Sequence, residues 1–343
     1  MNSSDNETVS CNTYQSDGVR IALSIVLIFA ILVGGAGNLL LTFLVIRRTQ
    51  MHSVINILLS LMSISDAFLS TICAPLDLVT IITDKWMFGT CMCSVHGFLL
   101  SVFVVQNVTL LVIISIDRYY ILIHKKNRLT SCNSISLISG CLIFSIAVSS
   151  PPLFGSGQFT FGNEHCGQLV DHGMDAVIYY GLYSSLLFVL PCGLLLLAYG
   201  HIIIALKKSN FTVQPECCRS RRNELLKSRL DINVRFKQKT FSTILYLYAA
   251  AMTFKLPLAF TLLVKSITYS IECPVSLRVV VFVYLNGAVN SFIYAFKITP
   301  YWMVLTGKFQ VVKQRVNSMR SNGKNDRQSV YRITSRVSTS SVI

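Results

Sequence analysis

Charged side chains are scarce in this 343-residue sequence. Asp, Glu, Lys and Arg make up only 13% of the residues, whereas apolar residues make up 52%. Soluble proteins usually carry about 25% charged residues. So few charges cannot coat a water-exposed surface of this size, which predicts that lipid covers part of the molecule.

Acidic residues are the scarcest charged class, with 15 Asp and Glu against 30 Lys and Arg and a net charge of +15. Such an excess can indicate a nucleic-acid partner. The basic residues, however, lie in particular loops between apolar runs. That distribution is typical of membrane topology and of contact with anionic membrane lipids, so no nucleic-acid partner is expected.

The sequence also lacks an apolar stretch near Met1, because its first 19 residues are polar and acidic. A cleavable signal peptide is therefore not expected. The first apolar run would both target the chain to the membrane and anchor it there. The chain has no zinc-ligand pair, nucleophile elbow or phosphate loop. We therefore expect neither an enzyme nor a cofactor.

Seven apolar stretches approach the length of about 20 residues that a bilayer crossing needs. They cover residues 20–46, 54–82, 94–123, 134–154, 175–206, 240–265 and 277–298. No internal repeat of the kind found in transporters is visible. The sequence therefore predicts an all-α membrane protein, with a seven-transmembrane helix bundle over residues 20–298.

The Lys and Arg residues predict the orientation of the bundle. If the N-terminus lies outside, all but a few of them fall on the inner side; the exceptions are Arg20, Lys85, Lys255, Lys265 and Arg278. The positive-inside rule favours this arrangement. Residues 1–19 would then form an extracellular tail, with glycosylation sequons at Asn2 and Asn6, on a protein of the plasma membrane.

Short motifs lie inside the predicted spans in a fixed order. They are Gly37-Asn38, Asp66, Cys93 with Asp117-Arg118-Tyr119, Pro191 with Tyr199, Pro257, and Asn290-Ser291-Phe292-Ile293-Tyr294. Together they resemble the rhodopsin-class G-protein-coupled receptors across nearly the whole chain. Residues 53–93 and 236–241 are similar to those of a small group of orphan receptors, one of which was once proposed to respond to lysophosphatidic acid.

The resemblance implies a disulfide between Cys93 and Cys166. This bond would hold the second outer loop, which contains Cys166, over the entrance to the ligand-binding site. The outer face of the membrane is oxidising, so such a bond can persist there. The chain has 11 cysteines, an odd number. The sequence leaves open how Cys11, Cys91 and Cys273 pair.

Activation residues are implied at the inner end of the bundle. In the family, an Arg such as Arg118 is held at rest by the adjacent acid, here Asp117, and is freed to meet a heterotrimeric G protein. The other residues implied in coupling and activation are Tyr119, Tyr199, Asn290 and Tyr294. Many members also hold the Arg with an acid at the base of the sixth span. Here residues 235–237 read Arg-Phe-Lys, which predicts some basal activity.

Asp66 is a carboxylate near mid-membrane, where a charge is costly unless it is paired. The resemblance implies a sodium ion at this position, with polar neighbours at Asn107, Asn286 and Asn290. The alternative is a protonated aspartate that is hydrogen-bonded in the core.

The sixth span departs from the family pattern, because Lys255 replaces a Trp and Ala251 replaces a Phe. A buried lysine needs a partner or loses its proton. Three interpretations remain open. Lys255 pairs with Asp66 as a tethered cation, it meets an acidic ligand, or it is neutral in a receptor that no longer signals.

The sequence indicates the class of ligand less directly than it indicates the family. Amine receptors carry an Asp where this chain has Leu100, so an amine ligand is not expected. The candidate pocket residues are Asp77, His96, Leu100, Lys255 and Tyr284. A small molecule or a lipid entering between helices is compatible with them.

Beyond the bundle, residues 299–312 predict a short amphipathic helix on the cytoplasmic membrane surface. Residues 313–343 predict a disordered tail, with phosphorylation sites for arrestin-like partners. Its last three residues, Ser341-Val342-Ile343, resemble a PDZ-domain ligand.

Three other functions compete with a signalling receptor. A receptor-like scaffold without G-protein output is favoured by Lys255 and Ala251. A photoreceptor is disfavoured because Tyr284 stands where opsins carry the retinal lysine. A transporter would have no use for the Arg118 motif.

Overall fold

The computed structural model describes most of the bundle. Its described residues are 16–48, 51–123, 131–154, 158–161, 166–169, 174–194, 196–197, 200–201, 204, 221–268, 277–298 and 301–302. Several predicted features lie outside these residues. They are the sequons at Asn2 and Asn6, Tyr199, nearly all of the 299–312 helix, and the 313–343 tail.

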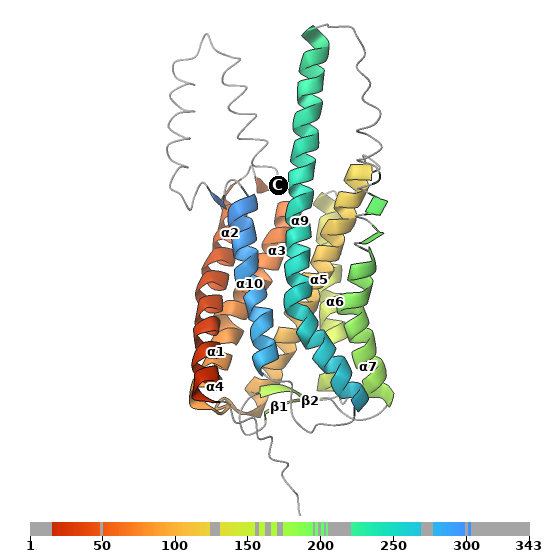
Figure 1. Cartoon of the computed structure of the whole chain (residues 1–343). Coiled ribbons are helices and arrows are strands. Elements are labelled where there is room, and N and C mark those ends of the chain that lie inside the picture. Colours follow the sequence, from red (N-terminus) through yellow and green to blue (C-terminus); the bar gives the residue numbers. More distant parts are fainter. Residues whose placement is uncertain are drawn as a thin grey trace, which may run out of the picture.

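Seven rods of helix run side by side (Figure 1). The first consists of α1 (Asp17–Phe29), η1 (Ala30–Gly34) and α2 (Gly35–Arg47), and the second of α3 (Val54–Phe68), η3 (Leu69–Cys73) and α4 (Ala74–Thr83). The next three are α5 (Gly89–Ile123), α6 (Ser131–Ser149) and α7 (Met174–Ser184), which continues as η5 (Ser185–Val189). The last two are α9 (Arg221–Thr268) and α10 (Leu277–Lys297).

Length and composition agree with seven crossings. Six of the described rods are long and apolar enough to cross a membrane, and Ile135–Ser149 within α6 is a shorter apolar helix. Large apolar side chains such as Ile25, Leu32 and Ile46 are more than half exposed on the outside of the bundle. An apolar outer surface is what lipid contact requires. The predicted all-α seven-helix bundle is confirmed.

Two local predictions were incomplete. The predicted sixth span covers residues 240–265 only, but α9 begins at Arg221 and extends beyond the bundle (Figure 1). The segment 221–239 is rich in Leu, Lys and Arg and has no Gly or Pro, so a helix can propagate through it. The other difference is an antiparallel hairpin of β1 (Gln158–Phe161) and β2 (Cys166–Leu169), with Phe161 opposite Cys166.

The hairpin lies at one end of the bundle, and the projecting part of α9 lies at the other (Figure 1). We call these the hairpin end and the Arg118 end, because α5 runs from Gly89 near the hairpin toward Arg118. A 3-10 turn, η4 (Pro151–Leu153), follows α6 at the hairpin end. Pro257 lies inside α9, where it cannot donate a backbone hydrogen bond.

Close packing joins the first and seventh rods. Asn38 Nδ2 donates to the carbonyl oxygens of Gly34 (2.8 Å) and Gly287 (3.0 Å) and lies 3.2 Å from Ser291 Oγ. The Tyr301 hydroxyl donates to the Gly37 carbonyl oxygen at 3.1 Å. Burial raises the pKa of Tyr301 to about 12, so its hydroxyl keeps the proton that it donates.

Candidate functional site

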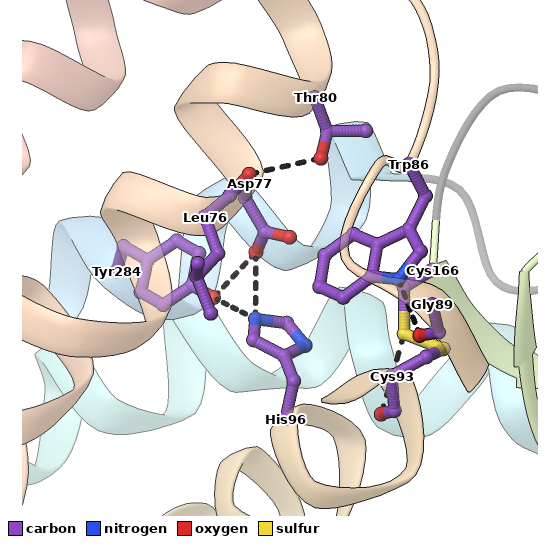
Figure 2. Close-up of a disulfide and its surroundings, with 9 residues drawn as sticks. All are labelled: Leu76, Asp77, Thr80, Trp86, Gly89, Cys93, His96, Cys166 and Tyr284. Carbon is purple, nitrogen blue, oxygen red and sulfur yellow. Dashed lines mark hydrogen bonds and ion pairs between the residues drawn. A yellow bond between two sulfur atoms is a disulfide. The ribbon is translucent and has the colours of Figure 1, made fainter. Parts of the chain in front are cut away.

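The disulfide between Cys93 and Cys166 confirms the pairing that the resemblance implied. It joins the start of α5 to β2, with Cα atoms 5.5 Å apart, and both residues are buried. Trp86 packs beside it, with its Nε1 donating to the Gly89 carbonyl oxygen at 2.9 Å (Figure 2). Gly89 has φ of 78°, a conformation that only glycine adopts readily, and this lets the chain turn into α5.

A polar cluster lies beneath the disulfide, formed by Asp77, His96 and Tyr284 from α4, α5 and α10 (Figure 2). The Tyr284 hydroxyl donates to Asp77 Oδ2 at 2.5 Å, and His96 Nε2 lies 3.4 Å from the same oxygen. His96 Nε2 is also 3.4 Å from the Tyr284 hydroxyl. All three side chains are buried, so the cluster ties three helices together at the hairpin end.

This arrangement bears on the candidate ligand pocket. Asp77, His96 and Tyr284 contact one another, and Leu100 is partly buried against the apolar core. The polar atoms of the cluster face each other, and one oxygen of Asp77 already has two partners. Lys255 makes no hydrogen bond to any of them within the described part of the chain. Three of the five predicted residues therefore form one contact group.

We expect Tyr284→Phe to lower the free energy of unfolding by about 1–3 kcal/mol, because it removes a buried donor from the Asp77 carboxylate. Thermal melting of the purified protein in detergent measures the change. Tyr246→Phe is the matched control, since the Tyr246 side chain is 50% exposed on α9. Equal melting temperatures for both variants would contradict a stabilising role for the cluster.

A second polar cluster lies in the centre of the bundle around Asp66, which is 2% exposed. Asn107 Nδ2 donates to Asp66 Oδ1 at 2.6 Å, and Asn290 Nδ2 donates to Asp66 Oδ2 at 2.8 Å. Asn286 is also buried. The structure thus brings α3, α5 and α10 together at the position where the sequence placed a polar site.

Lys255 does not make the direct ion pair with Asp66 that one interpretation predicted. It is 4% exposed, and its Nζ has no hydrogen-bond partner among the described residues. Lys255 nevertheless lies on α9, which packs against α5 and α10, the helices that carry Asn107 and Asn290. The direct contacts of the Asp66 carboxylate among the described residues are the amide groups of Asn107 and Asn290.

At the Arg118 end, the guanidinium of Arg118 pairs with the neighbouring acid. Nη2 lies 2.7 Å and Nε lies 3.2 Å from Asp117 Oδ2. Among the described residues this is the ion pair that Arg118 makes. Tyr294 is fully buried, and its hydroxyl has no hydrogen-bond partner there.

Sequence reasoning missed two groups of polar contacts. The Tyr119 hydroxyl lies 3.3 Å from His201 Nδ1, which links α5 to a residue that follows the fifth rod along the chain. Ser101 Oγ lies 3.0 Å from Ser149 Oγ and 3.1 Å from the Tyr183 hydroxyl. Serines and tyrosines within apolar spans were the available signal, but a single sequence does not show which of them face each other.

Comparison with known proteins places this geometry in context. The model of the family "7 transmembrane receptor (rhodopsin family)" matches residues 37–294. The human "Probable G-protein coupled receptor 63" is 30% identical over 305 residues, covering 82% of this chain and 71% of that protein. The human "Probable G-protein coupled receptor 45" is 27% identical over 319 residues, covering 86% and 84%.

A third relative is the "High-affinity lysophosphatidic acid receptor" of Xenopus laevis. It is 27% identical over 251 residues, covering 68% of this chain and 66% of that receptor. Among solved structures, squid rhodopsin superposes with a TM-score of 0.74 at 18% identity, covering 87% of each chain. At that identity the likeness concerns the fold alone.

Proposed function

Because the chain belongs to the rhodopsin family of seven-transmembrane receptors, we propose that it transmits an extracellular or lipid-borne signal to a heterotrimeric G protein. The family is not enzymatic. The observation that carries the proposal is the Arg118–Asp117 pair at the end of α5, with a 2.7 Å contact between the guanidinium and the carboxylate. Asp117 is the described acid that holds Arg118, so breaking this one ion pair would free the guanidinium for a partner protein.

The proposed orientation follows from charge and chemistry. The Lys and Arg residues concentrate toward the Arg118 end, which favours a cytoplasmic location for that end. The Cys93–Cys166 disulfide lies at the hairpin end, and disulfides persist in oxidising surroundings. We therefore place the hairpin end and the N-terminus outside, in the plasma membrane.

The ligand is proposed to be a small molecule or a lipid. Leu100 gives an amine no carboxylate on α5, and Asp77 is already engaged by Tyr284 and His96. The resemblance to a lysophosphatidic acid receptor supports a lipid. Basal signalling is measured in cells without added ligand, so the identity of the ligand is not needed to test the proposed function.

The decisive measurement is G-protein dissociation in cells without added ligand, across all G-protein classes. Asp117 is the one described acid that pairs with Arg118, and residues 235–237 contain no acid. We expect signalling above background from the wild type, and we expect Arg118→Ala to abolish it. Arg47→Ala is the control at equal surface expression, because Arg47 is an exposed basic residue at the same end of the bundle.

The second candidate function is a receptor-like scaffold without G-protein output. It is favoured by one observation: Ala251 and Lys255 are both buried in α9, where the family carries aromatic side chains. A wild-type protein that is silent across every G-protein class would favour the scaffold. Arrestin-like and PDZ-domain partners would bind the tail, which lies outside the described residues, and they stay predictions.

A further inference from the structure

The central cluster contains complementary polar atoms that are left unpaired. Asn107 and Asn290 use their amide nitrogens to bind Asp66, so their Oδ1 atoms have no donor among the described residues. The Oδ1 atom of Asn286 also lacks a donor. Lys255 Nζ, which is buried on α9, lacks an acceptor among the described residues. A charged ammonium has three N–H donors and no acceptor. It therefore has one donor for each of the three unpaired amide oxygens.

Charge adds a second reason to connect these groups. A buried carboxylate or ammonium is costly without an opposite charge. Among the described residues Asp66 receives only neutral amide donors, and Lys255 is a buried cation on α9, which packs against the helices α5 and α10 that carry those amides. Each group therefore supplies the countercharge that the other lacks.

A sodium ion does not fit this cluster. Carboxylate and amide oxygens are suitable ligands for a hard cation, and Asp66 with its three asparagines provides them. The Lys255 ammonium, however, is buried on α9, which packs against the helices α5 and α10 that carry the three asparagines. A metal cation at Asp66 would face a second positive charge in a low-dielectric core, where like charges repel strongly.

We propose that the Lys255 ammonium is the counter-ion of Asp66. It takes the place of a bound sodium ion and prevents a metal cation from binding to the Asp66 carboxylate and the asparagine oxygens. Stability should then be independent of sodium in the wild type. Removing the ammonium should make the protein responsive to sodium. The inference goes beyond G-protein signalling, because it concerns which cation the core holds.

The test is a melting cycle in detergent with the wild type, Asp66→Asn, Lys255→Met and the double variant. Each protein is melted in sodium chloride and in N-methylglucamine chloride of equal ionic strength. We expect each single substitution to lower the melting temperature by roughly 5–15 °C, because it strands the other charge. The double variant should lose less than the sum of the two, because the residues share one interaction.

The sodium comparison gives the sharper outcome. The wild type should melt at the same temperature in both salts, whereas Lys255→Met should melt higher in sodium. The double variant, without the carboxylate, should lose that response. Lys255→Arg is the charge-preserving control and should remain insensitive to sodium. If Lys255→Met cannot be purified, Lys255→Gln also removes the charge.

Three results would overturn the inference. The first is a wild type that is stabilised by sodium. The second is strict additivity of the two single substitutions, which would show that the charges do not interact. The third is a Lys255→Met variant that is indifferent to sodium, which would release Lys255 for contact with an acidic ligand. The melting temperature is measured on the purified protein without a G protein. A negative result in this experiment is therefore distinct from a negative result in the G-protein dissociation assay.

Discussion

Cys93→Ala should lower the free energy of unfolding by about 2–5 kcal/mol and block delivery to the cell surface. The disulfide closes a segment with a sequence separation of 73 between its two cysteines. Its loss frees a long loop in the unfolded chain, and the cost of that freedom grows with loop length. Cys166→Ala should have an effect of the same size, because it breaks the same bond.

The matched control is Cys91→Ala. Cys91 lies two residues from Cys93 in α5, but it is exposed and has no disulfide partner among the described residues. Its substitution should leave surface delivery and melting unchanged. The double variant of Cys93 and Cys166 should lose little more than either single variant, because residues that share one bond are not additive. Additive losses would show that the two cysteines act separately.

The disulfide also matters for what lies beneath it. Cys93, Cys166 and Trp86 form one buried group at the hairpin end, and His96 lies one turn of α5 below Cys93. The Trp86 and His96 rings are 5.5 Å apart. Loss of the bond should therefore loosen the Asp77–His96–Tyr284 cluster as well as the hairpin. The melting loss of a Cys93→Ala, Tyr284→Phe double variant would then fall below the sum of the singles.

The sequence was sufficient where the signal was local or carried by the family resemblance. Apolar run length predicted the seven rods, because a bilayer sets the length of a crossing helix. The resemblance predicted the Cys93–Cys166 bond across a separation of 73 residues. Asp66 could be singled out because a carboxylate in an apolar span is costly by itself.

The sequence was insufficient where geometry between distant residues decides. Tyr284 and Asp77 are 207 residues apart and meet only because α10 packs beside α4. A pair between Lys255 and Asp66 was one of three open interpretations, but among the described residues Asn107 and Asn290 bind the carboxylate and Lys255 Nζ has no hydrogen-bond partner. Charge alone does not predict which side chains bind the Asp66 carboxylate, because this depends on how the amide groups of Asn107 and Asn290 are oriented.

The other large effect is expected where the first and seventh rods touch. Gly37→Ala should lower the free energy of unfolding by about 3 kcal/mol, at the upper end of the usual cost of overpacking. A Cβ atom at Gly37 would lie 2.4 Å from both Cβ and Oγ of Ser291, and 3.0 Å from the Tyr301 hydroxyl. Since α2 and α10 cannot move independently of the Asn38 hydrogen bonds, the clash must strain that network.

Gly181→Ala is the control, because Gly181 also lies in a membrane helix but a Cβ there would meet nothing within 4 Å. Alanine favours helix over glycine by about 1 kcal/mol, so this variant should be neutral or stabilised. Ser291→Gly removes both clashing atoms, and combining it with Gly37→Ala should cost less than the two single losses together. A Gly37→Ala variant that melts like Gly181→Ala would show that α2 and α10 separate freely. In that case, the close approach of Gly37 to Ser291 would not be required for stability.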